Sequence, residues 1–169
     1  MTQTIHLRPA RADDAAGIAR VHVDSWRTTY GGIVPDEHLA NLSYESREQR
    51  WRERLTAPDN AMFIYVAETE DGQIVGFATG GAERENDPVY KGEVYALYLL
   101  KEYQQRGIGR QLVVTVARRL RQAGFANMLI WVLAENPACA FYAALSGKLA
   151  REKTVNIGGE DLRDWVRVG

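Results

Sequence analysis

The sequence predicts a mixed α/β domain with a mostly antiparallel sheet flanked by helices. Short strand patterns joined by turn signals stand near both ends of the chain, as in antiparallel hairpins. In the middle, an apolar run at residues 94–100 is followed by a glycine-containing loop and an amphipathic run at residues 108–122. This order is typical of a strand–helix–strand crossover. A chain of 169 residues is most simply one domain, here residues 1–169.

The N-terminal half carries signals for three strands and three helices. Asp13 or Asp14 can cap the first helix, and Ser43 can cap the third. Asp71 and Gly72 form a turn signal between two strands. The elements expected are a strand at 5–8, helices from 13 or 14 to about 26, at 35–42 and at 44–55, and strands at 62–68 and 73–80.

The C-terminal half begins after a polar loop at 83–91. An apolar stripe at helical spacing predicts that the helix at 108–122 buries one face. The members of this stripe are Ile108, Leu112, Val113, Val116 and Leu120. The other elements expected are strands at 94–100 and 128–133, a helix from Pro137 to about Gly147, and strands at 149–157 and 162–168.

Composition excludes several classes of protein. The net charge of −1 gives no electrostatic case for binding nucleic acid or an acidic membrane surface. The longest apolar runs are far below membrane-span length, and the first residues lack the pattern of a signal peptide. The single cysteine excludes an internal disulfide, and these features together lead us to expect a cytoplasmic location. The three histidines show no metal-ligand spacing with the cysteine or with carboxylates, so we expect no metal.

The loop from Gln104 to Arg110 is the most informative segment. It lies between a predicted strand and a predicted helix, where backbone N–H groups and the helix N-terminus favour an anion. Arg106 and Arg110 add positive charge. The Lys-Ser/Thr pair of a Walker loop is absent, and Leu112 occupies the place of the third glycine of a dinucleotide fingerprint. We therefore expect a different phosphate-bearing ligand.

The order Gln-x-x-Gly-x-Gly, filled by Gln104, Gly107 and Gly109, resembles the acetyl-CoA loop of the GNAT superfamily of acyl-CoA-dependent N-acetyltransferases. The resemblance extends over residues 5–168 and is strongest over 93–147, where Asn-Pro and Phe-Tyr pairs follow the next strand. It implies the fold of that family, in which the central strands splay apart. It also implies an enzyme that uses acetyl-CoA as co-substrate.

The resemblance implies which residues bind acetyl-CoA. The loop would hold the pyrophosphate, and the backbone of the central strand would pair with the pantetheine arm. The candidates are Leu97, Tyr98, Leu99, Gln104, Gln105, Arg106, Gly107, Ile108, Gly109, Arg110 and Asn136. Core packing for the strand side chains, and a helix cap for Asn136, are the structural alternatives.

Two residues are candidates for catalysis. Tyr142 stands where family members carry a tyrosine that protonates the CoA sulfur, and its alternative role is a core aromatic. Glu93 stands where some members carry a glutamate that takes the amine proton, often through water, and its alternative is a solvated strand-end charge. Strict alternation would place residues 93, 95, 97 and 99 on one face of the strand and 94, 96, 98 and 100 on the other.

The acceptor is expected to be a primary amine on a small molecule. Trp26 and Tyr30 are four residues apart on one predicted helix, and with Tyr95 they could line the acceptor site. Core packing for Trp26 and Tyr30, and a proton relay for Tyr95, are the alternatives. The alternatives are a protein N-terminus or lysine as acceptor, a non-catalytic CoA-binding sensor, and a nucleotide-binding protein. The final strands could pair between subunits to form a homodimer. Acceptor identity and acyl chain length stay open.

Overall fold

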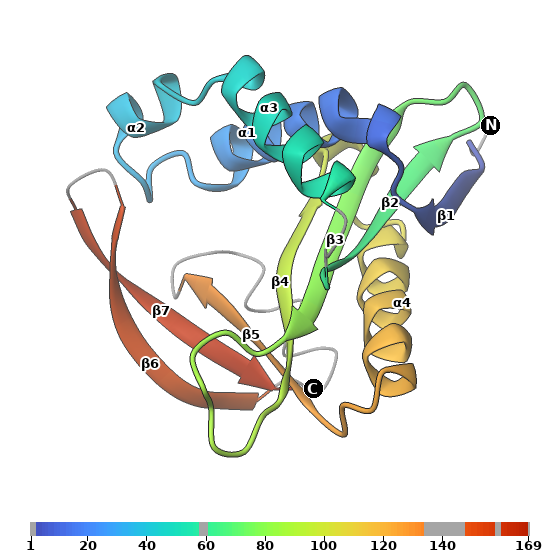
Figure 1. Ribbon diagram of the computed structural model, residues 1–169. Helices are drawn as coiled ribbons and strands as arrows, with labels where there is room; N and C mark the ends of the chain where they lie inside the picture. The colour runs from blue at the N-terminus through green and yellow to red at the C-terminus, as the bar shows by residue number, and fades with distance from the viewer. Residues whose placement is uncertain (1–2, 58–60, 134–147, 158–159, 169) are drawn as a thin grey trace.

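The computed structural model describes residues 3–57, 61–133, 148–157 and 160–168. Within them a single seven-stranded sheet has the order β1-β2-β3-β4-β5-β7-β6, and only the β4–β5 pair is parallel (Figure 1). The mostly antiparallel sheet predicted from the sequence is therefore confirmed. The strands are β1 Ile5–Pro9, β2 Phe63–Thr69, β3 Ile74–Ala82, β4 Gly92–Leu99, β5 Met128–Leu133, β6 Lys148–Ile157 and β7 Glu160–Val168.

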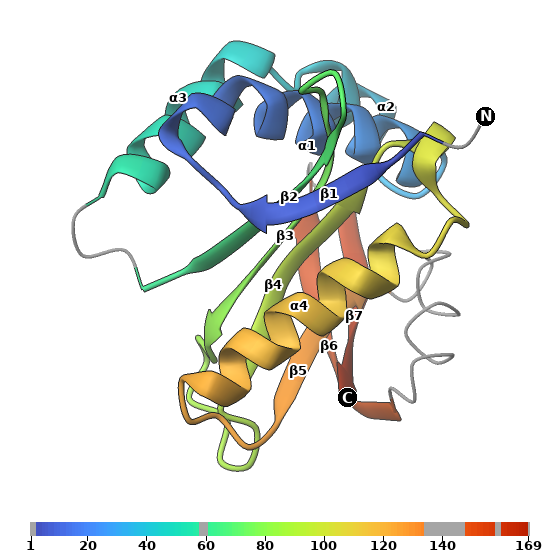
Figure 2. The same ribbon diagram turned by 90° about the vertical axis from the view of Figure 1, so that its right-hand side faces the viewer.

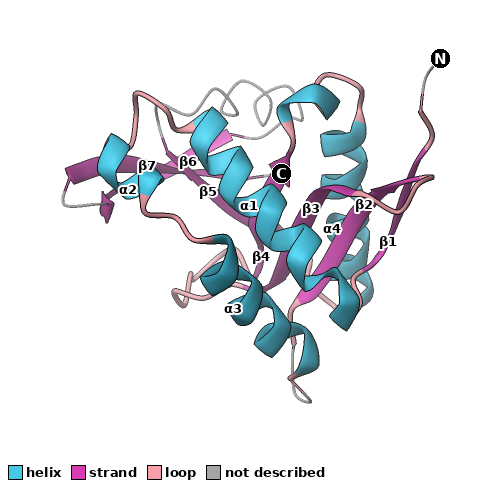
Figure 3. Cartoon of the chain, turned by 90° about the horizontal axis from the view of Figure 1, so that it is seen from above, coloured by secondary structure: helices cyan, strands magenta, loops and turns pink. Residues whose placement is uncertain are grey.

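Helices cover both faces of the sheet. The helices α1 (Ala15–Thr29), α2 (Asp36–Ala40) and α3 (Tyr44–Thr56) lie on one side, and α4 (Ile108–Gln122) lies on the other (Figures 2 and 3). Two short 3-10 helices, η1 (Ala12–Asp14) and η2 (Lys101–Tyr103), precede α1 and follow β4. None of the helices in the described ranges is long and apolar enough to span a membrane.

Two apolar clusters hold these layers together. The predicted stripe on α4 is fully confirmed, because all five of its members are buried, and they pack with Val75, Ala78 and Val94 of the sheet. On the opposite face, Ile18 and Val21 of α1 pack with Trp51 of α3 and Phe77 of β3. The sheet between β2 and β4 is thus buried from both sides.

The strands β4 and β5 pair only where they begin. Their ladder consists of two residue pairs, Gly92 with Met128 and Glu93 with Leu129. The strand β5 then continues beside β7 from Leu129 to Leu133, while β4 stays paired with β3 up to Leu99. Beyond Glu93, β4 therefore runs without a ladder to β5 in the described part of the chain, and β5, β7 and β6 turn away from it (Figure 1).

A β-bulge interrupts β4 at Tyr95. Thr79 pairs with Ala96 and Gly80 pairs with Val94, so Tyr95 has no partner residue on β3. The bulge shifts the alternation of the strand. The prediction that Leu97 and Leu99 share a face with Glu93 is therefore wrong, since both leucines pack with Val94 in the cluster beneath α4.

The first helix begins differently from the prediction. Asp14 occupies the N-cap position of α1, but its side chain makes no capping hydrogen bond. Its carboxylate accepts hydrogen bonds from the guanidinium of Arg8 and from the backbone N–H of Arg11. At α3 the prediction is confirmed, because the Ser43 hydroxyl accepts the N–H of Ser46 at 3.2 Å. The helix predicted after Pro137 lies outside the described residues.

Candidate active site

The loop between η2 and α4 has the geometry of an anion cradle. Gln105 and Gly107 both adopt left-handed backbone conformations, with φ of 61° and 81°. Gly107 is the N-cap of α4, and the first N–H groups of a helix have no partner within it. The side-chain amide of Gln104 donates to the carbonyl of Leu99 at 3.2 Å, which ties the loop to the end of β4.

The glycine at 107 is needed for its backbone conformation and leaves the surface open. A Cβ atom built there would meet no atom within 4 Å, so the space beside the helix N-terminus is free for a ligand. The partial positive charge of the helix end favours a phosphate at such a position. These features fit the pyrophosphate of acetyl-CoA.

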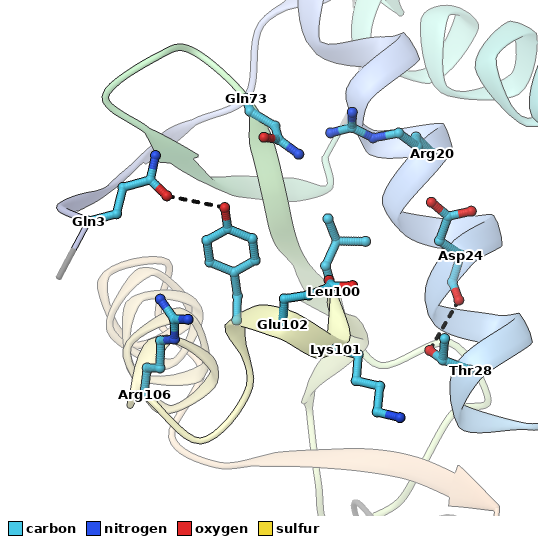
Figure 4. Close-up of a pocket in the computed structure, with 10 residues that line it drawn as sticks. Gln3, Arg20, Asp24, Thr28, Gln73, Leu100, Lys101, Glu102 and Arg106 are labelled. Atoms are coloured by element: carbon cyan, nitrogen blue, oxygen red, sulfur yellow. Dashed lines mark hydrogen bonds between the residues drawn. The ribbon is translucent and has the colours of Figure 1, made fainter. Parts of the chain in front are cut away.

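Arg106 turns back from this loop toward the sheet. Its guanidinium lies 5.2 Å from the ring centroid of Tyr103, whose hydroxyl donates to Gln3. Both side chains line a pocket of about 600 Å³ between η2 and α1, together with Arg20 and Asp24 (Figure 4). Arg110 is exposed on the first turn of α4. The structure therefore places both predicted cations at the loop, where Arg106 lines the pocket and Arg110 is exposed to solvent.

Glu93 is the most deeply buried carboxylate near the bulge. Its side chain is 1% exposed, and its Oε2 lies 2.6 Å from a guanidinium nitrogen of Arg84. Its Oε1 accepts the backbone N–H of Arg84 at 3.2 Å. Glu93 is thus held by one residue of the preceding loop, and the alternative of a solvated strand-end charge is wrong.

Tyr95 completes this group. The guanidinium of Arg84 lies 4.2 Å from its ring centroid, and its hydroxyl donates to the carbonyl of Ala82. Because Arg84 contacts both side chains, Glu93 and Tyr95 lie on the same side of the sheet, as predicted. Burial raises the pKa of Tyr95, and the neighbouring charge of Glu93 raises it further. The phenol is therefore a hydrogen-bond donor at neutral pH.

The loop that carries Arg84 is fixed at several points. The Glu83 carboxylate accepts the N–H groups of Glu85 and Asp87. Asn127, just before β5, accepts the N–H of Lys91 and donates to the carbonyl of Val89. These bonds join the loop to the point where β4 and β5 begin, so Arg84 is presented to Glu93 from an ordered segment.

An aromatic cluster lies on the α1 side of β4. The rings of Trp26 and Tyr30 are 4.5 Å apart, as their spacing on one helix predicts. The indole N–H of Trp26 donates to the hydroxyl of Tyr98 at 2.9 Å. Tyr98 in turn stacks on His22, with centroids 5.0 Å apart. We call the group of Trp26, Tyr30, His22 and Tyr98 the aromatic wall. The side chain of Tyr98 belongs to it, a role that the sequence did not predict.

His22 lies at the centre of this cluster. Its Nδ1 accepts the indole N–H of Trp51 at 3.3 Å. Burial, together with the nearby charges of Arg47 and Arg54, lowers its pKa to about 3. His22 is therefore neutral at physiological pH. Its helical spacing from Trp26 was the one signal in the sequence that could have linked it to the site.

The remaining candidates divide into two groups. Leu97 and Leu99 lie on the segment of β4 that follows the bulge, with side chains in the core beneath α4. Asn136 and Tyr142 lie outside the described residues. In the described ranges, His, Cys, Asp and Glu form no group of three that could hold a metal ion.

Comparison with known proteins identifies related chains. Residues 17–147 match the family described as Acetyltransferase (GNAT) family. The chain is 40% identical over 95% of its length, and 90% of the relative, to the uncharacterized N-acetyltransferase YuaI of Bacillus subtilis. It is 24% identical, over 79% of its length and 81% of the relative, to a spermidine N(1)-acetyltransferase of Thermoplasma acidophilum. The PaiA N-acetyltransferase of Thermoplasma acidophilum, solved with coenzyme A, has a TM-score of 0.72 at 20% identity, covering 96% of this chain and 98% of that one.

Proposed function

The chain belongs to the GNAT family of N-acetyltransferases, and we propose that it moves an acetyl group from acetyl-CoA to a primary amine of a small molecule by direct attack in a ternary complex. The observation that carries this proposal is the separation of β4 from β5 after Glu93, next to the loop at Gly107. Backbone groups of β4 and the helix N-terminus are then available to one extended ligand. Its thioester would lie near the bulge at Tyr95.

The reaction needs a neutral amine. A free alkyl amine has a pKa near that of lysine, about 10.4, so most of it is protonated at neutral pH. Glu93 is the proposed base, taking the proton directly or through a water molecule. The amine nitrogen forms a bond to the thioester carbonyl carbon, and the bond from that carbon to sulfur breaks. Tyr142 is the proposed donor of a proton to the departing thiolate.

Arg84 would position this base. Its ion pair and backbone N–H hold both oxygens of Glu93, which fixes the direction of the carboxylate. Placement of reacting groups can by itself supply roughly 7–11 kcal/mol of a barrier in favourable cases. An acetyltransferase that relies mainly on placement needs few catalytic side chains.

The aromatic wall supports a small-molecule acceptor. Trp26 and Tyr98 are partly buried and are joined by a hydrogen bond on the side of β4 opposite α4, while Tyr30 is 7% exposed and packs with Val34 and Leu39. Aromatic faces attract ammonium groups. One relative is named a spermidine N(1)-acetyltransferase, so a small-molecule amine is an acceptor within this family.

The test has two steps. Acetyl-CoA should raise the melting temperature, since a ligand at 100 times its Kd stabilises the native state by about 2.7 kcal/mol, whereas ATP and NAD should not. Release of free CoA thiol is then followed with a panel of primary amines, and double-reciprocal plots at varied acetyl-CoA should intersect. Parallel lines would indicate an acetyl-enzyme instead of direct attack, and binding without transfer to any amine would indicate a sensor.

A further inference from the structure

Arg47 lies on the face of α3 that is turned toward α1 and β4. It stands one helical turn before Trp51, and Trp51 donates a hydrogen bond to His22 of α1. The side chain of Arg47 is half-buried, as its position between the two helices requires. The guanidinium therefore borders the aromatic wall described above.

The other half-buried arginines among the described side chains, residues 3–57 and 61–130, all have partners. Arg8 binds the carboxylates of Asp14 and Glu68. Arg20 donates to the carbonyl of Ile74 at 2.7 Å, and Arg119 lies 4.2 Å from the ring centroid of Phe63. The side chain of Arg47 makes no hydrogen bond or ion pair with any of these described side chains or their backbone.

The charges near Arg47 do not compensate it. Burial lowers the pKa of its guanidinium, and Arg50 and Arg54 lower it further, while the Tyr98 hydroxyl acts in the opposite direction. The neighbouring acid Glu48 on α3 is already paired with Arg52. None of the guanidinium nitrogens of Arg47 is among the buried unpaired polar atoms of the described residues, so they reach solvent. A solvent-accessible guanidinium with other cations nearby attracts an anion, and none of the described carboxylates pairs with it, so an anionic ligand can bind it from solvent.

Building on the proposed function, we propose that Arg47 binds an anionic group of the acceptor, so that the enzyme prefers amines that also carry a carboxylate or a phosphate. A guanidinium is suited to this task because its planar N–H groups match both anions. The same charge repels a polyamine. The preferred acceptors would then be amino acids or aminoalkyl phosphates.

The test compares matched acceptors. Each pair has the same carbon skeleton and primary amine, with and without the anionic group, and separate carboxylate and phosphate series show which anion is taken. The wild-type enzyme should favour the anionic member in kcat/KM by about tenfold to a hundredfold, the range for a hydrogen bond to a charged group. Arg47→Gln should abolish this preference by raising KM for the anionic member, with kcat and the KM of the neutral member little changed.

Two further variants of Arg47 and one control variant complete the design. Arg47→Lys should recover part of the preference, and Arg47→Glu should shift it toward diamines. Arg52→Gln is the control, because Arg52 is exposed on the same helix and pairs with Glu48. The melting temperature of each variant confirms that it is folded.

Three results would overturn the inference. If the wild-type enzyme has an equal or higher kcat/KM for neutral amines or polyamines than for the anionic amines, the proposal of an anionic acceptor is wrong, while the proposed acetyl transfer still holds. A loss of kcat for every acceptor in Arg47→Gln indicates a structural role. Binding of acetyl-CoA without transfer to any amine would remove the proposed function and this inference together.

Discussion

The guanidinium of Arg84 and the carboxylate of Glu93 form an ion pair across 2.6 Å, and the Glu93 side chain is 1% exposed while that of Arg84 is 55% exposed. The partner that orients the buried acid therefore approaches from solvent. It is carried by the loop at 83–91, which Asn127 anchors to the start of β5. The proposed base is accordingly positioned by a group outside the core.

Glu93→Gln should reduce kcat by about a hundredfold or more, the lower end of the range for general acid–base catalysis, without weakening the binding of acetyl-CoA. The amide keeps the shape of the side chain but accepts a proton poorly. Steady-state kinetics and a thermal-shift titration measure the two effects. Glu68→Gln is the matched control, because Glu68 is also paired with an arginine but lies on β2, away from the site. Similar turnover in both variants would exclude Glu93 as the base.

Tyr142→Phe should lower kcat more than it weakens CoA binding, because the hydroxyl is proposed to act on the departing sulfur only in the transition state. The kcat and the Kd of CoA, measured on the same preparation, separate the two effects. Acceptors do not need to be charged for this measurement, so it is independent of Arg47. Unchanged turnover would remove Tyr142 from the mechanism.

Gly107→Ala should raise KM for acetyl-CoA and lower stability. Its φ of 81° is left-handed, and a side chain in that region costs about 1–2 kcal/mol. The added methyl group would also occupy the open space where the pyrophosphate is expected. Gly72→Ala is an apt control, since Gly72 has a φ of 85° and a similarly open Cβ position in the β2–β3 turn. Equal KM values in the two variants would show that the loop does not approach the cofactor.

The sequence predicted the elements of the fold well because their signals are local. The spacing of apolar residues on α4 requires only its own helix, and all five were found buried. Two predictions, the helix cap by Asp14 and the face of Leu97, were wrong because they depend on contacts with other elements. Arg8 of β1 takes the carboxylate of Asp14 away from the helix cap, and the register of β3 creates the bulge that moves Leu97 to the α4 side.

The candidate site was predicted less completely for the same reason. The glycine loop is contiguous, so its residues could be read from the sequence. The pairing of Arg84 with Glu93 depends on the path of an irregular loop, and the wall formed by His22, Trp26 and Tyr98 joins α1 to β4. The roles of Asn136 and Tyr142 remain predictions.

Stability should depend on pH through His22. Its pKa is about 3 in the folded chain, mainly because of burial, and 6.5 in the unfolded chain. The unfolded state therefore binds the extra proton between these values, and the free energy of unfolding falls as pH decreases below 6.5. From pH 7.5 to 4.5 the loss should be about 2 to 3 kcal/mol greater than in His22→Gln. Urea unfolding at both pH values measures this difference, and equal losses would contradict it.

The bulge at Tyr95 has a consequence for chain length. Thr79 and Gly80 already pair with Ala96 and Val94. A strand that lacked Tyr95 would therefore form an uninterrupted ladder, and all of its remaining side chains would stay on their present faces. The pairing of β3 with β4 does not require this residue, and the bulge bends β4 where its ladder with β5 has ended.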